Sequence, residues 1–221
     1  DSLTYLTRHN FYNCTNLEEV NLPSLIRSGS TPLDANFFDC TALKTFIAPK
    51  LQMVGGSCFS GCTSLETITV PLLNTINDGY AFRNCTSLKA FIAPKLGAIA
   101  SYSFDGCSKL ETVSTPLLQT IGSYAFQNCT SLKTLDCSKV TTLNENAFAG
   151  CTSLEELNFK TGVTVLENAF KSSFSADKIV FNVPLTLSDV PSGIPVAIPS
   201  SVKTITASNT ENFIIYGSLG S

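Results

Sequence analysis

The chain has 221 residues, of which 43% are hydrophobic and 14% are charged, and its formal net charge is −3. This composition supplies enough apolar material for a large core. The slight negative charge, without any run of Lys or Arg, argues against a nucleic-acid partner or an anionic membrane. No stretch approaches the roughly 18 consecutive apolar residues of a membrane-spanning helix, so we expect no membrane insertion.

A short repeat organises the sequence. Seven cysteines recur at intervals of 22 to 26 residues, namely Cys14, Cys40, Cys62, Cys85, Cys107, Cys129 and Cys151. A phenylalanine precedes each of them by three residues and a leucine follows each by three, and Phe170 continues this register beyond the last cysteine. Self-similarity at such a period is typical of stacked coils, none of which can bury its apolar side alone. We therefore predict a solenoid whose Phe, Cys and Leu positions point inward.

Each coil is expected to contain one short strand and one short turn. The apolar-x-apolar alternation after each leucine predicts a strand, and a proline such as Pro49 or Pro71 ends it by withholding an N–H group. The predicted strands begin near Leu17, Leu43, Leu65, Leu88, Leu110, Leu132 and Leu154. The A-F-x-x-C segment has the i, i+3 spacing of a single helical or 3₁₀ turn.

The two ends of the repeat differ from its middle. The segment IRSGSTP, between Leu25 and Leu33, lengthens one coil by about four residues and should protrude as a loop. After Phe170 the pattern degrades, although KIVFNVP at 178–184 predicts a strand and NFIIYG at 212–217 is expected to cover the open end of the core. We therefore predict a solenoid of about seven to eight coils over residues 1–175, followed by a diverged terminal coil and a C-terminal cap over residues 176–221.

The motifs LETITVPLLNTI (65–76) and AFRNCTSL (81–88) resemble the BspA-type leucine-rich repeat, which is found in large surface proteins of bacteria and some protists. The resemblance covers roughly residues 3–170. It implies an α/β repeat fold, a right-handed leucine-rich-repeat solenoid with a concave parallel β-sheet and short helical or 3₁₀ turns on the convex side. It also implies surface exposure and adhesion to host matrix proteins or to other cells.

A second period of two coils places alternating charges after the strand leucines, at Glu18, Lys44, Glu66, Lys89, Glu111, Lys133 and Glu155. Parallel strands lie about 4.8 Å apart, so we expect each charge to meet opposite charges on both sides. The candidate binding residues of this concave face are Lys44, Ile47, Glu66, Thr67, Thr69, Lys89, Ile92, Glu111, Lys133 and Glu155. A ladder of exposed ion pairs is an alternative role for the charges, and single surface isoleucines are common enough to need no function.

An alternative binding surface is a stripe of tyrosines. Tyr80, Tyr102 and Tyr124 occupy one register in three successive coils, two residues before the repeated phenylalanine. They are expected to stack along an edge or the convex side. Mutual packing over the turn is one explanation, and an interface, for which tyrosine is well suited, is the other.

The nine cysteines favour buried, reduced thiols, because seven share the inward register and no C-x-x-C pair exists. Disulfides between adjacent coils and a metal site are the alternatives. The only histidine is His9, so a Ser-His-Asp or Cys-His arrangement could centre nowhere else. We predict no enzymatic activity, no metal and no cofactor.

Two functions from different classes remain. The first is a non-catalytic protein-binding module of an extracellular or cell-surface, adhesin-like protein, monomeric and binding through the concave sheet. Its alternating charges have almost no net field, which suits a mixed polar protein surface. The second is a passive structural or spacer array within a larger surface or assembly protein.

Overall fold

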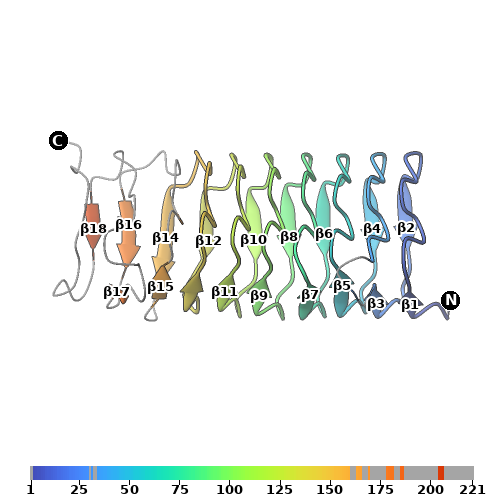
Figure 1. The fold of residues 1–221 in the computed structure, drawn as a ribbon, viewed down its shortest axis with the longest axis horizontal. Coiled ribbons are helices and arrows are strands. Elements are labelled where there is room, and N and C mark those ends of the chain that lie inside the picture. Colours follow the sequence, from blue (N-terminus) through green and yellow to red (C-terminus); the bar gives the residue numbers. More distant parts are fainter. Residues whose placement is uncertain are drawn as a thin grey trace.

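The structure is a computed structural model that describes residues 2–29, 31, 34–159, 163–165, 169, 178–181, 185–186 and 204–206. Short coils follow one another along the long axis of the molecule (Figure 1). Each coil contributes one strand to each of two parallel ladders, formed by the even-numbered and the odd-numbered strands. The fold is therefore a parallel β-solenoid, as the repeat predicts.

The even-numbered strands are β2 (Glu19–Asn21), β4 (Thr45–Ile47), β6 (Thr67–Thr69), β8 (Ala90–Ile92), β10 (Thr112–Ser114), β12 (Thr134–Asp136), β14 (Glu156–Phe159), β16 (Lys178–Phe181) and β18 (Thr204–Thr206). They are hydrogen-bonded in three groups, β2–β4, β6–β8–β10 and β12–β14–β16–β18. We call the outward side of these strands the even-strand face. It is the surface that the sequence predicts as the concave binding face.

The odd-numbered strands are β1 (Tyr5–Leu6), β3 (Arg27–Ser28), β5 (Met53–Gly55), β7 (Thr75–Asn77), β9 (Ala98–Ile99), β11 (Thr120–Ile121), β13 (Thr142–Leu143), β15 (Val163–Val165) and β17 (Leu185–Thr186). The prediction of one strand per coil was therefore wrong. These strands are two or three residues long, and a central one such as β11 buries a single inward residue, Ile121, so it shows no alternation that a sequence could reveal.

The predicted helical or 3₁₀ turns are absent from the described part of the chain, which contains no helix. Each A-F-x-x-C segment is instead a pair of tight turns between residues with positive φ, such as Tyr80 at 64° and Asn84 at 58°. The N–H of Phe82 donates to the carbonyl of Ser103 in the next coil at 2.8 Å. Because neighbouring coils satisfy these backbone groups, and left-handed residues interrupt any helix, the i, i+3 spacing is met without helical structure.

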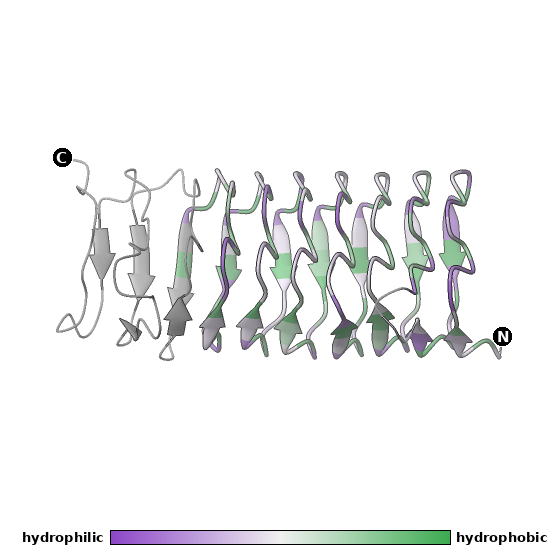
Figure 2. Cartoon of the chain, in the orientation of Figure 1, coloured by the Kyte–Doolittle hydropathy of each residue, from purple (hydrophilic) through white to green (hydrophobic). Residues whose placement is uncertain are grey.

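The core is a continuous stack of phenylalanines. Neighbouring rings are nearly parallel, with centroids 5.1 to 5.4 Å apart, along Phe11, Phe37, Phe59, Phe82, Phe104, Phe126 and Phe148. The inward residues of the even-numbered strands join the core, and Phe46 and Phe91 contact this stack edge to face. Hydrophobic residues accordingly occupy the strand centres in Figure 2. The inward Phe and Leu positions are thus confirmed, except that Phe170 lies outside the described residues.

The repeated cysteines have a hydrogen-bonding role that the sequence does not indicate. The thiol of Cys107 donates to the carbonyl of Phe82 in the preceding coil at 3.0 Å, and five further coils repeat this contact at 3.0 to 3.1 Å. All nine cysteines are unbridged and eight are buried. Cys14 is exposed, so the predicted inward register is wrong there, because no described coil covers it on the N-terminal side.

The described C-terminal strands continue the stack. β16 pairs in parallel with β14, and β18 pairs in parallel with β16, so the strand predicted within 178–184 is present. The domain boundary near residue 175 stays a prediction. The expected cap at 212–217 lies outside the described residues, as do residues 30 and 32 of the expected loop.

Candidate binding surface on the even-strand face

The alternating charges of the even-strand face form separate pairs. Among the described residues, the ammonium and carboxylate groups lie 2.8 Å apart in Glu18–Lys44, 2.9 Å apart in Glu66–Lys89 and 3.7 Å apart in Lys133–Glu155. The expectation that each charge meets opposite charges on both sides was wrong among the described residues. No ion pair joins Lys44 to Glu66 where the sheet is interrupted, and Lys89 pairs with Glu66 but not with Glu111, although β8 and β10 are hydrogen-bonded. The bond from Lys44 lowers the pKa of Glu18, and the bond from Lys89 lowers the pKa of Glu66. Exposed pairs of this kind contribute little stability.

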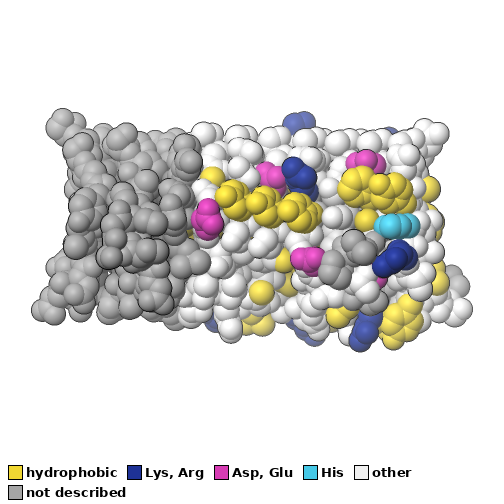
Figure 3. All heavy atoms as spheres, in the orientation of Figure 1, with side chains coloured by type: hydrophobic (Ala, Val, Ile, Leu, Met, Phe, Trp, Pro, Cys, Tyr) yellow, Lys and Arg dark blue, Asp and Glu magenta, His cyan; other side chains and the backbone are white. Residues whose placement is uncertain are grey.

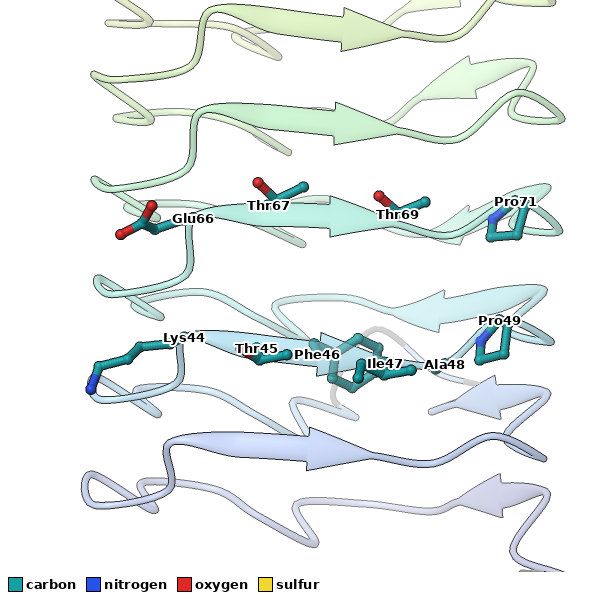
Figure 4. Close-up of a pocket in the computed structure, with 10 residues that line it drawn as sticks. All are labelled: Lys44, Thr45, Phe46, Ile47, Ala48, Pro49, Glu66, Thr67, Thr69 and Pro71. Carbon is teal, nitrogen blue, oxygen red and sulfur yellow. The ribbon is translucent and has the colours of Figure 1, made fainter.

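A groove lies where the sheet is interrupted between β4 and β6. Its volume is about 620 Å³, and it is lined by Lys44, Thr45, Phe46, Ile47, Ala48, Pro49, Glu66, Thr67, Thr69 and Pro71. Figure 4 shows the ammonium of Lys44 directed away from β6, and this group donates to Glu18, the residue before β2. Since Glu66 likewise pairs with Lys89, no ion pair between Lys44 and Glu66 closes the groove in the described structure. The floor is apolar and the rims carry hydroxyl groups and charges.

The two candidate isoleucines lie in different environments. Ile47 is 42% exposed and lines the groove, because β6 is not hydrogen-bonded to β4 on that side. Ile92 is half-buried, since β8 lies inside an intact group of strands and Ile92 is in register with Thr69 and Ser114. The structure therefore brings Ile47 together with Thr67, Thr69, Lys44 and Glu66, and leaves Ile92 outside the groove.

The remaining candidates of this face, Lys89, Glu111, Lys133 and Glu155, are all exposed. Lys89 lies next to the groove through its bond to Glu66, whereas Lys133 and Glu155 form a pair beyond β10. The sequence did not predict the interruption of the sheet, nor the contribution of Pro49 and Pro71 to the groove. The sequence assigned both prolines only the role of ending the preceding strand.

The stacking predicted for the tyrosine stripe is confirmed, whereas its use as an interface stays a prediction. The ring centroids are 4.8 Å apart for Tyr80–Tyr102 and 4.7 Å apart for Tyr102–Tyr124, with nearly parallel planes. Figure 3 shows a row of hydrophobic side chains on this side of the molecule, flanked by acidic and basic ones. The guanidinium of Arg83 lies 5.6 Å from the centre of the Tyr80 ring. The inner ring faces are therefore covered, and a partner would meet ring edges and hydroxyl groups.

Other site classes find little support in the described residues. No group of three or more His, Cys, Asp and Glu side chains is placed to hold a metal ion there. His9 contacts the ring of Tyr12, with centroids 5.1 Å apart. Nor does this part of the chain contain a helix with the length and hydrophobicity that a bilayer crossing requires.

These features define a class: a leucine-rich-repeat type solenoid with a face of parallel strands. A family model described as the BspA type leucine-rich repeat region matches residues 1–89 and 75–191, with six copies. The chain belongs to the BspA-type leucine-rich repeat family. Repeats of this kind are generally structural or binding units.

Three solved structures are similar to this chain, and the first of them is a leucine rich repeat protein. The T. pallidum protein TpLRR is 26% identical, with a TM-score of 0.60 over 80% of this chain and 78% of its own. A leucine-rich cell surface protein from Faecalibacterium prausnitzii A2-165 is 18% identical, with a TM-score of 0.48 and coverage of 95% and 84%. The pneumococcal vaccine antigen PcpA is 21% identical, with a TM-score of 0.42 and coverage of 92% and 69%. No curated protein matched.

Proposed function

We propose that this chain is a non-catalytic, protein-binding module of an extracellular or cell-surface protein, and that it binds through the even-strand face. The observation that supports this most directly is the groove between β4 and β6. It combines an exposed apolar side chain, Ile47, with the threonine hydroxyls of both strands and with charged groups at one end. Surface exposure and adhesion are what the family resemblance implies.

The groove suits one protruding apolar side chain of a partner protein. That side chain would pack on Ile47 and on the rings of Pro49 and Pro71. The hydroxyl groups of Thr67 and Thr69 would form hydrogen bonds with the partner's backbone. The strands on both sides are fixed by the solenoid, so binding costs little ordering entropy on this side of the interface. Lys44 and Glu66 would orient polar groups of the partner at the rim.

The test is a screen of the purified chain against a panel of matrix and cell-surface proteins, followed by two matched variants. Ile47→Ser removes the apolar wall of the groove and should weaken binding about fivefold, since covering its exposed part contributes about 1 kcal/mol. Ile92→Ser makes the same chemical change in the same sequence context, FIAPKL, outside the groove, and should change Kd less than about twofold.

Equal losses in the two isoleucine variants would contradict the groove assignment. A Tyr80→Ser/Tyr102→Ser/Tyr124→Ser variant that alone abolishes binding would move the surface to the tyrosine stripe. If no partner is retained at any concentration in the screen, the passive spacer array becomes the better explanation.

A further inference from the structure

The turns that follow the even-numbered strands carry a row of lysines. The third residue of five successive turns is, in order, Lys50, Leu72, Lys95, Leu117 and Lys139. The three lysines are exposed, Leu117 is 42% exposed and Leu72 is half-buried. We call these five residues the edge row. Its lysines are 45 and 44 residues apart in the chain, so they form no basic run in the sequence.

No ion pair in the described part of the chain neutralises the positive charge of the edge row. The five ion pairs found among the described residues involve none of its lysines. The turns themselves contain no acid, and Asp136, just before the last turn, accepts a bond from the N–H of Ser138. By contrast, the same three coils carry Lys44, Lys89 and Lys133 on the even-strand face, where each is paired with a glutamate.

The spacing of the edge row is set by the coils. Successive lysines lie two coils apart. This corresponds to about 10 Å, because the stacked phenylalanine rings of these coils lie 5.2 to 5.4 Å apart, also where the even-numbered ladder is interrupted. Backbone bonds join the residues that follow these turns: the N–H of Asn74 donates to the carbonyl of Gln52 at 3.0 Å, and that of Thr141 to the carbonyl of Gln119 at 2.9 Å. A leucine lies between each pair of lysines. The edge row is thus a line of cations with apolar side chains between them.

We propose that the edge row binds a linear anionic polysaccharide that carries one carboxylate or sulfate group per disaccharide. An extended β-linked chain returns the same group to the same side at every second sugar, a length comparable to two coils. Its acidic groups would meet Lys50, Lys95 and Lys139, and the C–H faces of the intervening rings would pack on Leu72 and Leu117. The charge complementarity would also speed the encounter at low ionic strength.

Other partners fit this line less well. An extended peptide repeats one face about every 6.6 Å, out of step with the lysines. An acidic helix repeats a face every seven residues, about 10.5 Å, but such helices bind by laying an apolar face into a groove. The edge row instead follows the row of turns along the lower edge of Figure 1. It shares no residue with the groove, so it does not depend on the protein-binding proposal.

The experiment measures binding of a hyaluronan hexasaccharide, whose three carboxylates match the three lysines, to the whole 221-residue chain at low salt. N-acetylchitohexaose is a neutral control with the same number of rings. Lys50→Ala/Lys95→Ala/Lys139→Ala should raise Kd for the hexasaccharide about tenfold, because this variant removes three exposed ion pairs with the ligand at once. Lys44→Ala/Lys89→Ala/Lys133→Ala removes the same charge from the same coils at the even-strand face and should raise it less than about twofold.

The expected result is salt-sensitive binding of the hexasaccharide that only the edge variant weakens, with both variants folded by circular dichroism. Equal weakening by both variants would overturn the proposal, since net charge alone would then explain binding. So would binding of the neutral hexaose with equal affinity. Binding of anionic lipid vesicles, or of a helical peptide with glutamate at every seventh position, without any binding of the hexasaccharide would also overturn it.

Discussion

Gly122 lies where the backbones of two coils approach closely, and Gly97 lies on a neighbouring coil with open space around it. A Cβ atom added to Gly122 would lie 2.6 Å from the backbone nitrogen of Ser101, 2.8 Å from the carbonyl carbon of Ala100 and 2.9 Å from the carbonyl oxygen of Ile99. A Cβ added to Gly97 would meet only the carbonyl oxygen of Leu117, at 3.9 Å. The same substitution therefore tests backbone crowding at two otherwise similar positions.

The expected effects of alanine have opposite signs. Gly97→Ala should stabilise the protein by about 0.5 kcal/mol, because alanine restricts the unfolded chain without a clash. Gly122→Ala gains the same entropy but forces backbone atoms of adjacent coils apart, which costs about 1–3 kcal/mol or more. The neighbouring backbone cannot move aside, because the N–H of Gly122 donates to the carbonyl of Ile99 at 2.8 Å. The net destabilisation should be about 0.5–2.5 kcal/mol or more.

The assay is equilibrium unfolding in guanidinium chloride, followed by circular dichroism, with the midpoints and slopes of both variants compared with those of the unsubstituted chain. Gly122→Ala should lower the midpoint and Gly97→Ala should raise it slightly. Comparable shifts of both midpoints in one direction would refute the close approach of coils at Gly122. A changed slope in the Gly122→Ala variant would indicate that adjacent coils uncouple, as a stacked array permits.

The remaining predictions concern thiols and charges. In the native state a thiol reagent should modify Cys14 fast and the other cysteines slowly, because burial raises the pKa of Cys40 to about 11 and that of Cys58 to about 12. Under denaturant without reductant about nine groups should react, and a count near one would show that coils are bridged. In an NMR titration, Lys44→Gln should raise the pKa of Glu18 and leave the pKa of Glu66 unchanged. A shift of both pKa values would instead show that Lys44 interacts with both glutamates, as a continuous ladder of charges requires. Because the folded pKa of Glu18 is depressed, its small contribution to stability is present above pH 4.5, the ordinary pKa, and is lost as pH falls through the folded pKa.

The inward residues could be predicted from the sequence because their positions recur in register. A Phe, Cys or Leu that repeats every coil while its neighbours vary must meet a constraint common to all coils, and burial in a shared core is that constraint. The function of the cysteine could not be predicted in this way. The register shows that Cys107 points inward, but only the structure shows its thiol reaching the carbonyl of Phe82 in the preceding coil.

The candidate site could be predicted only in part, because its character depends on neighbouring coils. Ile47 and Ile92 stand in identical segments, FIAPKL, so their own sequence cannot distinguish them. The difference arises from the strand beside each: β4 is not hydrogen-bonded to β6, whereas β8 is bonded on both sides. The odd-numbered strand of each coil could not be predicted for a related reason. It has only two or three residues and pairs only with other coils, so its own sequence shows no apolar alternation.

The two-coil period links both proposed surfaces. Coils with the segment FIAPKL carry one lysine after the strand leucine and another after the proline, as in Lys44 and Lys50. The intervening coils carry a glutamate and a leucine at the corresponding positions, as in Glu66, which pairs with Lys89, and Leu72. The same lysine-bearing coil therefore carries one paired lysine on the even-strand face and, in the edge row, one lysine without an ion pair among the described residues. The difference arises from the intervening coil, which offers a glutamate at the first position and a leucine at the second. Adding one such pair of coils would lengthen the edge row by one lysine and one leucine. The affinity for an anionic polysaccharide should therefore rise with the number of repeats. The net charge of the even-strand face would stay near zero, because each added lysine there comes with an added glutamate.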